Sequence, residues 1–258
     1  MGVGLGTELA QLRPYQIGDD LRHLDPAASG RTGEPHIRLH VPERALSTWI
    51  VIDVSPSMAF GTAQRLKADV AEGVALAFGR LGIRRTGSVA ALAFGASGPR
   101  SLPLRGSKPG MVALRRLLAE GVSPDGEHDP GALGDALSRI GRLAKAPGLV
   151  VVISDFREQQ HWERALGSLR LRHAVLAVEV SDPREAELPA VGRLVLVDPE
   201  TGERTHIETG SRRVRDRFAA LERERKARVA AELRRLRVDH VGLSTAEDWL
   251  AALGRALR

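Results

Sequence analysis

The chain has 258 residues, 43% of them hydrophobic and none of them cysteine, and its formal net charge is +6. This length suits one large domain, or one domain with an appendage. The lack of cysteine excludes disulfides, thiolate zinc sites and a cysteine nucleophile, and fits a reducing compartment. No stretch approaches the ~18 consecutive apolar residues of a membrane helix, and the start lacks the features of a signal peptide, so we expect a soluble cytoplasmic protein.

The positive charge is concentrated in one segment. Residues 211–237 hold 11 basic and 4 acidic residues, which leaves the rest of the chain near neutrality. The segment also has the apolar spacing of a helix that packs along one stripe, and we interpret its charges as a solvated helix face. Nucleic-acid binding through this basic helix is the alternative, although nine aromatic residues in the whole chain offer few base-stacking platforms. The apolar positions are Val214, Phe218, Leu221, Val229, Leu233 and Leu236.

From residue 36 onward the sequence predicts strands that alternate with helices. Residues 8–35 are polar and rich in turn-forming residues, without a sustained period. The alternation indicates an α/β protein with a mostly parallel, doubly wound sheet and helices on both faces. The predicted strands are 36–41, 49–54, 88–94, 148–156, 173–182 and 238–244, with a short edge strand at 101–104 and a β-hairpin at about 190–208. The predicted helices are one capped by Thr62 and running to Phe78, then 109–120, 131–144, 161–171, 211–237 and 246–257.

Oxygen-bearing side chains follow two of the most apolar strands. Asp53 ends the first and is followed by Ser55 and Ser57, and Asp155 ends the second. Because ligands of open α/β sheets collect at the carboxyl ends of the strands, these four residues predict a site for a hard cation such as Mg²⁺, with Mn²⁺ or Ca²⁺ as alternatives. The other interpretation is that these side chains only bond backbone amides at a turn. The presence of acids at two strand ends favours the metal.

Catalytic motifs are less well supported. The sequence has no phosphate-binding Gly-x-x-x-x-Gly-Lys-Ser/Thr loop and no Gly-x-Ser-x-Gly elbow. A metal-dependent phosphohydrolase of the haloacid-dehalogenase type would need a second aspartate two residues after Asp53, where Ser55 stands. We therefore expect a protein that is not an enzyme.

Two resemblances sharpen this prediction. Asp53-x-Ser55-x-Ser57 after an apolar strand resembles the metal-ion-dependent adhesion site of von Willebrand factor type A domains. The segment LRPYQIGDDLRHLDPAASGRTGEPHIR is similar to the bacterial domain-of-unknown-function 58 family, as are ISDF and LAVEVSDPREAELPAVG. Pro26 and Gly30 depart from the family pattern, which has Trp and Ala there. The matching positions are Arg13, Tyr15, Gly18, Asp19, Asp20, Arg22, Asp25, Arg31, Thr32 and Gly33.

This resemblance implies a domain arrangement and a function. Residues 1–45 would form an extension packed on the sheet, and 46–258 a von Willebrand A-like domain with the hairpin as an insertion. The family pairs with MoxR-type AAA+ ATPases, which implies a non-enzymatic interaction module in chaperone-like maturation or remodelling of client proteins. The chain opens almost on the family motif, so we expect a short form or a late start.

The resemblance also assigns roles to the candidate site residues. Ser55 and Ser57 would bind the metal directly, and Asp53 and Asp155 directly or through water. The family often adds a threonine from the loop before helix 131–144, where this chain offers only Asp129 or His128, so the site is expected to be weak or degenerate. For the motif from Tyr15 to Asp25, an internal salt-bridge and turn network and a partner-binding role remain equally open.

Overall fold

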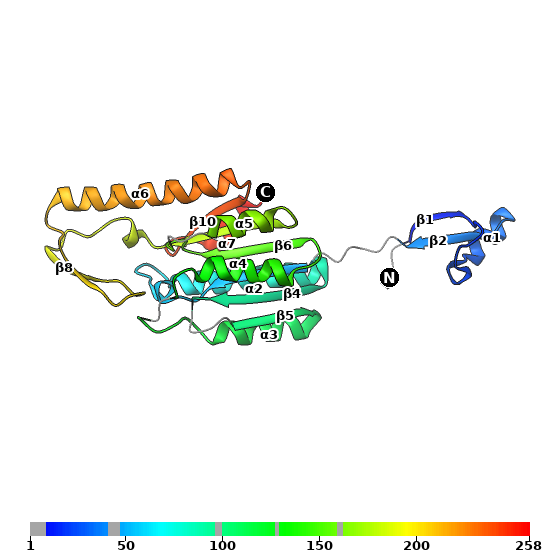
Figure 1. Cartoon of the computed structure of the whole chain (residues 1–258), viewed down its shortest axis with the longest axis horizontal. Helices are drawn as coiled ribbons and strands as arrows, with labels where there is room; N and C mark the ends of the chain where they lie inside the picture. The colour runs from blue at the N-terminus through cyan, green and yellow to red at the C-terminus, as the bar shows by residue number, and fades with distance from the viewer. Residues whose placement is uncertain (1–8, 41–46, 96–99, 127–128, 159–161) are drawn as a thin grey trace. The chain divides into compact units, whose positions relative to one another are not determined.

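The structure, a computed structural model, describes residues 9–40, 47–95, 100–126, 129–158 and 162–258. The chain divides into two compact units, residues 1–45 and 46–258 (Figure 1). The packing of the first unit on the sheet of the second stays a prediction.

The N-terminal unit is built on a two-stranded antiparallel sheet. Its first strand was not predicted, because its sequence, LAQLRP, has no strict apolar alternation. The strand is defined by its pairing with the second strand, which places Arg13 opposite Ile37. Between the two strands lie a 3₁₀ helix and a short α-helix. The elements are β1 (Leu9–Pro14), the 3₁₀ helix Leu21–His23, α1 (Pro26–Thr32) and β2 (His36–His40).

The larger unit has a six-stranded sheet in the order β10-β7-β6-β3-β4-β5. All neighbours are parallel except β5, which runs antiparallel to β4 at the edge, where the sequence predicts an edge strand. The predicted α/β class with a mostly parallel, doubly wound sheet is confirmed. The strands are β3 (Ser47–Asp53), β4 (Ser88–Phe94), β5 (Arg100–Gly106), β6 (Gly148–Ser154), β7 (Ala174–Ser181) and β10 (Asp239–Ser244).

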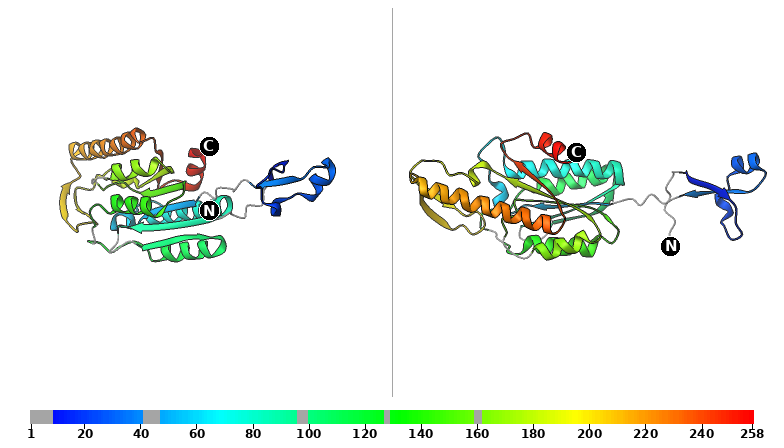
Figure 2. Two further views of the ribbon diagram at one scale, coloured as in Figure 1. Left: turned by 45° about the vertical axis from the view of Figure 1, so that its right-hand side comes forward. Right: turned by 90° about the horizontal axis from the view of Figure 1, so that it is seen from above.

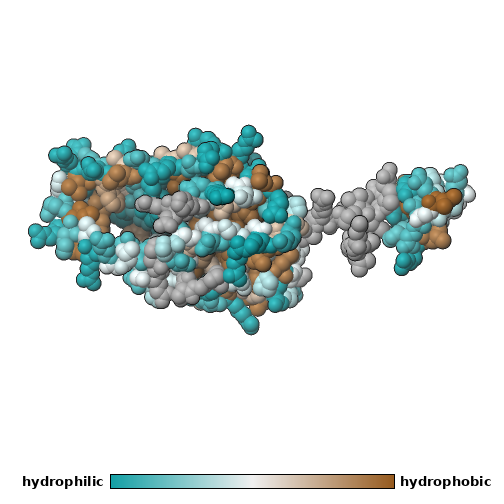
Figure 3. Space-filling view, in the orientation of Figure 1, coloured by the Kyte–Doolittle hydropathy of each residue, from teal (hydrophilic) through white to brown (hydrophobic). Residues whose placement is uncertain are grey.

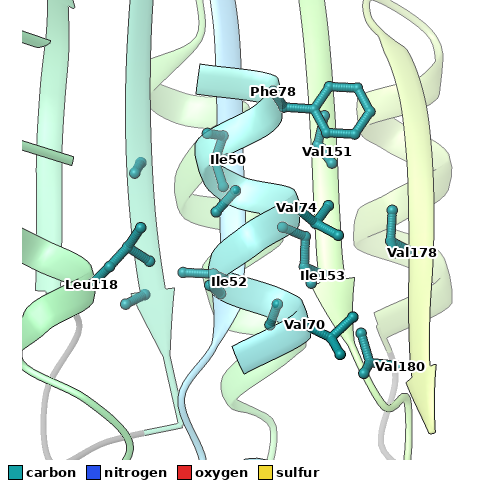
Figure 4. Close-up of a cluster of buried hydrophobic side chains, with 14 of the residues drawn as sticks. Ile50, Ile52, Val70, Val74, Phe78, Leu118, Val151, Ile153, Val178 and Val180 are labelled. Carbon is teal, nitrogen blue, oxygen red and sulfur yellow. The ribbon is translucent and has the colours of Figure 1, made fainter. Parts of the chain in front are cut away.

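Helices cover both faces of this sheet, as Figures 1 and 2 show. Side chains alternate along each strand, so the central strand β3 contributes Ile50 and Ile52 to one core and Trp49 and Val51 to the other. Figure 4 shows the first core, where Val70, Val74 and Phe78 pack on Ile50 and Ile52. On this face lie α2 (Lys67–Thr86), α3 (Ser107–Ala119) and α7 (Trp249–Ala256); on the other lie α4 (Ala132–Leu143), α5 (Trp162–Arg170) and α6 (Arg212–Arg235).

Helix α2 begins later than predicted. Thr62 does not cap it; its amide and hydroxyl both donate to Asp182, at 2.8 and 2.6 Å. The first turn is instead closed by Asp69, whose carboxylate accepts from the amide of Leu66 at 2.8 Å. Residues between the end of β3 and Lys67 are therefore free to form the loop that carries Ser55 and Ser57.

A β-hairpin lies outside the main sheet, where the sequence predicts a hairpin. It consists of β8 (Arg193–Val197) and β9 (Arg204–Glu208), which pair with each other as a separate two-stranded sheet. Figures 1 and 2 show it beyond the ends of the sheet strands, in yellow. Among the helices of the described residues, none combines the length and apolar character that crossing a membrane requires.

Candidate metal centre

The candidate site lies where β3 and β6 end side by side. The two strands are parallel neighbours, and their register pairs Ile52 with Ile153. Both strands therefore end at nearly the same level: β3 ends with Asp53, and β6 ends with Ser154, directly before Asp155. A 3₁₀ helix, Pro56–Ala59, follows β3 and turns Ser57 back toward the site. The topology thus brings together residues about a hundred positions apart.

The four predicted residues are joined by short hydrogen bonds. Ser57 Oγ donates to Asp155 Oδ2 at 3.0 Å and lies 3.1 Å from Ser55 Oγ. Asp53 Oδ1 accepts from the backbone amide of Ser55 at 2.9 Å, and Asp53 Oδ2 accepts from the hydroxyl of Ser154 at 2.6 Å. Asp53 thus bonds a backbone amide at the turn, as the structural interpretation expects. The side-chain oxygens of Ser55, Ser57 and Asp155 also lie close together, as the metal interpretation expects.

Glycine is required beside this loop. Gly95, at the end of β4, has a φ of +86°, and a Cβ there would lie 2.8 Å from Ser55 Cβ and 2.9 Å from Ser55 N. A side chain would therefore push directly on the loop that carries the two serines. The close approach of the β4 end fixes the position of Ser55.

Asp53 is a buried carboxyl group with little compensation. Its side chain is 6% exposed, and burial raises its pKa, as does the nearby charge of Asp155. Hydrogen bonds from Ser154 and Ser55 lower the pKa but leave it at about 7. Within the described ranges Asp53 forms no ion pair. A cation that bound here would neutralise a charge that the fold otherwise holds at a cost.

Asp155, in contrast, already has a cationic partner that we did not predict. Lys67, the first residue of α2, is fully buried, and its Nζ lies 2.7 Å from Asp155 Oδ2 and 2.7 Å from Glu185 Oε1. Burial lowers the pKa of Lys67, but the two carboxylates raise it by a larger amount. The pKa of Lys67 is therefore above its ordinary value. Burial likewise raises the pKa of Asp155, but Lys67 and Arg157 bring it below the usual range.

From Glu185 the ion pairs continue across the end of the sheet. Arg157 bonds Glu185 at 3.1 Å and Glu222 of α6 at 3.0 Å. Glu222 is bonded by Arg225 at 3.0 Å, and Arg225 reaches Glu179 of β7 at 3.1 Å. The inner face of the basic helix therefore contains buried acids and arginines that serve the fold.

Arg225 also holds the loop after β6. Its guanidinium donates to the carbonyl oxygens of Asp155 and Phe156 at 3.3 and 3.2 Å. Phe156 has a φ of +50°, a left-handed conformation that costs a non-glycine residue energy and that the surrounding contacts must maintain. The apolar stripe predicted for this helix is only partly right, because Val229 and Leu233 are buried whereas Leu221 is 55% exposed.

The donor set fits a hard cation, but the chain itself already places one positive charge, that of Lys67, at the site. Two carboxylates and two hydroxyls are the ligand types that Mg²⁺ prefers, and open positions would keep water. No group of three or more acidic or histidine residues suited to a metal occurs in the described part of the chain. Lys67 supplies part of the positive charge that a metal would bring. Of the two acids, Asp53 is the one whose charge no cation of the described residues balances.

The residue expected to substitute for the missing threonine stands just before α4, and its metal-binding role stays a prediction. Asp129 is exposed, and its carbonyl oxygen accepts from the amide of Ala132 at the start of α4. In the described part of the chain its carboxylate makes no hydrogen bond or ion pair with the four site residues. His128 lies outside the described residues.

The family motif forms a local network within the N-terminal unit. Arg13 makes two bonds of 2.8 Å to Asp19, and Asp20 pairs with Arg22 at 3.1 Å. Gly18, between them, has a φ of +108° that favours glycine. Each of these pairs closes part of the turn that follows β1.

The second half of the motif anchors α1. Asp25 accepts from the amides of Ala27 and Ala28, both at 2.9 Å, and pairs with Arg38 of β2 at 2.8 Å. Tyr15 bonds the chain by its backbone amide, and Arg31 is exposed on α1. The contacts are those of a turn network; the partner-binding role stays a prediction.

Sequence reasoning missed Lys67, Glu185, Arg157 and Glu222, and one signal was available. A lysine in the first turn of a helix faces the positive end of the helix dipole and is unfavourable there. Lys67 stands at that position, directly before an apolar stripe, so it needed an acidic partner. The partners come from distant segments, and no local pattern identifies them.

The comparisons place the chain among known proteins. The family described as Protein of unknown function DUF58 matches residues 11–228. An uncharacterized protein of Mycobacterium tuberculosis is 37% identical over 255 residues, 98% of this chain and 79% of that protein.

Solved structures similar to this chain were also found. An aerotolerance-related membrane protein from Bacteroides fragilis aligns at a TM-score of 0.50 and 15% identity, covering 82% of this chain and 98% of that chain. A von Willebrand factor type A protein from Catenulispora acidiphila aligns at a TM-score of 0.41 and 20% identity, over 53% of this chain and 33% of that chain. The chain belongs to the DUF58 family of proteins of unknown function.

Proposed function

We propose that the chain is a protein-interaction module, not an enzyme, whose binding site is the metal centre formed by Asp53, Ser55, Ser57 and Asp155. The observation that carries this proposal is the convergence of these side chains at the carboxyl ends of neighbouring strands. A bound Mg²⁺, Mn²⁺ or Ca²⁺ would supply an electrophilic position for a carboxylate of a partner. The serine hydroxyls and the two acids would hold the ion.

The expected partner comes from the family resemblance. It is a MoxR-type AAA+ ATPase, with a client protein as the second partner, in chaperone-like maturation or remodelling. Two features of this chain support an interaction role. The site lies in loops at one end of the sheet, and loops on a rigid scaffold commonly carry binding residues. One acid of the site is anchored, because Asp155 forms a buried ion pair with Lys67 of α2.

Metal binding is the first test. Thermal unfolding of the full chain is followed with and without 5 mM Mg²⁺ or Mn²⁺, for the wild type and Asp53→Ala. A ligand at about 100 times its dissociation constant adds about 2.7 kcal/mol, which raises the midpoint by several degrees for a domain of this size. We expect the rise in the wild type and its loss in Asp53→Ala.

The matched control is Asp216→Ala, which removes an exposed acid of α6 paired with Arg212 at 3.5 Å. This variant should keep the full metal effect. Equal midpoints with and without metal in the wild type would overturn the metal part of the proposal. Co-elution with a purified MoxR-type ATPase then tests the interaction, and hydrolysis of p-nitrophenyl phosphate by the metal-loaded wild type would contradict the non-enzymatic assignment.

A further inference from the structure

The tip of the β8–β9 hairpin touches the candidate site. The amide of Ser57 donates to Glu200 Oε1 at 3.0 Å. A second contact joins the same tip to the loop before α4, where the amide of Gly126 donates to the carbonyl oxygen of Pro199 at 2.8 Å. The tip therefore contacts two loops at this end of the sheet, although β8 and β9 are not part of that sheet.

The tip has a fixed shape of its own. The side chain of Asp198 accepts from the amide of Glu200 at 2.9 Å. The backbone of Asp198 bonds Glu203 at 2.9 Å and Gly202 at 2.7 Å. The turn thus presents the carboxylate of Glu200 on a preformed scaffold, so that little conformational entropy is lost when it binds.

The base of the hairpin is suited to a hinge. Thr209 bonds the carbonyl of Gly192 through both its amide and its hydroxyl, at 2.7 and 2.8 Å. Gly192 has a φ of +80°, and Gly210 follows Thr209. The two glycines thus lie next to the bonds that hold Thr209. In the described part of the chain, β8 and β9 pair with each other and with no strand of the main sheet. Figure 3 shows exposed apolar side chains (brown) gathered at the hairpin end, and Val195 and Val197 of β8 are 45% and 49% exposed.

The charge of Glu200 makes its position informative. The neighbouring site already holds two acids, and the charge of Asp155 is one of the causes that raise the pKa of Asp53. Glu200 adds a third carboxylate at this position, and its Oε1 accepts from the amide of Ser57.

We infer that Glu200 is an internal competitor, seated at Ser57 where an acidic side chain of a partner binds, and that the partner acts by displacing the hairpin tip. The inference rests on the proposed function of the same site and names the partner chemistry: a protein segment that presents Asp or Glu on a tight turn. The chain carries its own example of such a segment, residues 196–204, LVDPETGER.

Two measurements on the full chain test the inference. The first is amide exchange at Ser57 in the wild type, Glu200→Ala and Glu203→Ala. Glu203 lies in the same turn and is exposed, so its replacement is matched in charge and location. We expect exchange at Ser57 to accelerate at least tenfold in Glu200→Ala and to stay within twofold in Glu203→Ala. Equal rates in the wild type and Glu200→Ala would overturn the inference.

The second measurement uses a cyclised, fluorescently labelled copy of residues 196–204 as the probe. An internal tip competes at an effective concentration on the order of millimolar. The probe should therefore bind Glu200→Ala at least tenfold more tightly than the wild type or Glu203→Ala, and a probe with alanine at the glutamate should not bind. Identical binding to all three proteins would overturn the inference.

Repeating the titration with EDTA separates the two proposals. If the probe still prefers Glu200→Ala without metal, the competitor role stands and the metal-assisted function fails. If metal stabilises the wild type through Asp53 but the probe shows no preference, the metal site stands and the competitor role fails.

Discussion

The ammonium group of Lys67 lies 2.7 Å from Asp155 Oδ2, inside the site that the sequence assigns to a metal. One of the two carboxylates is thus neutralised by the chain itself, and the other, Asp53, is not. This asymmetry explains how the site stays folded without an ion: Lys67 and Glu185 complete a buried pair on the Asp155 side, while Asp53 is stabilised by hydrogen bonds and, at low pH, by a proton.

The first prediction concerns Lys67→Met. Removing the ammonium leaves Asp155 and Glu185 buried without their shared cation, which should reduce the free energy of unfolding by about 3–5 kcal/mol in metal-free buffer. Mg²⁺ should restore part of this loss, so its effect on the unfolding midpoint should exceed the effect on the wild type. Urea unfolding with and without Mg²⁺ measures both quantities.

The control for this variant is Lys145→Met, which removes an exposed lysine after α4. Its stability should stay within about 0.5 kcal/mol of the wild type. If Lys67→Met unfolds at the same urea concentration as Lys145→Met, Lys67 does not neutralise the site.

The second prediction is a pH dependence that comes from Asp53. Its folded pKa is about 7, above the ordinary value of 3.8, so between these values the native state binds more protons than the unfolded state. The free energy of unfolding therefore falls as pH rises through this window, by about 4 kcal/mol at most. Asp53→Asn removes the ionisable group, and with it this pH dependence, but keeps a side-chain oxygen that accepts hydrogen bonds.

We expect Asp53→Asn to be more stable than the wild type at pH 8 and similar to it near pH 4. Urea unfolding at half-unit intervals of pH measures the difference, with Asp216→Asn as the exposed control. Parallel curves for the wild type and Asp53→Asn would show that Asp53 ionises at its ordinary pKa.

The sequence predicted the sheet and the proximity of Asp53, Ser55, Ser57 and Asp155 because both depend on short-range patterns. Continuous apolar runs define β3 and β6, and parallel strands must end at the same edge, which brings Asp53 and Asp155 together. What was missed depends on long-range pairing. Nothing near Lys67 reveals Glu185, more than a hundred residues away, and nothing in β1 reveals a strand until β2 is placed beside it.

The expectations about the basic helix show the same limit. The pattern correctly places Val229 and Leu233 in the core, but it treats all arginines alike. Only the fold distinguishes Arg225, which turns toward the sheet, from Arg223, which is exposed and bonds the carbonyl of Ala219 in its own helix. Charge counts along a sequence cannot make this distinction, because it depends on which acids lie beneath the helix.

The third prediction tests the close approach of Gly95 to Ser55. Gly95→Ala places a Cβ within 2.8 Å of Ser55 Cβ at a backbone φ of +86°. We expect a loss of about 1–3 kcal/mol from backbone strain and displacement of the loop, together with a weaker Mg²⁺ effect on the unfolding midpoint. Differential scanning calorimetry with and without Mg²⁺ measures both.

Gly254→Ala is the matched control, because a Cβ at this position in α7 has nothing within 4 Å. It should be neutral or stabilising by up to about 1 kcal/mol, since alanine is the better helix former. A metal effect that survives intact in Gly95→Ala would mean that the Ser55 loop is not part of the metal centre.

The last prediction separates the structural and nucleic-acid roles of the basic helix. Arg225→Ala removes the partner of Glu222 and Glu179 and the donor to the carbonyls of Asp155 and Phe156, so it should cost about 3 kcal/mol of stability. Arg223→Ala should change stability by less than about 0.5 kcal/mol. A structural helix gives this difference and no binding to a 20-base-pair DNA duplex at 50 mM salt. A nucleic-acid-binding helix gives binding that falls steeply with salt and that Arg223→Ala weakens, because exposed arginines supply the phosphate contacts.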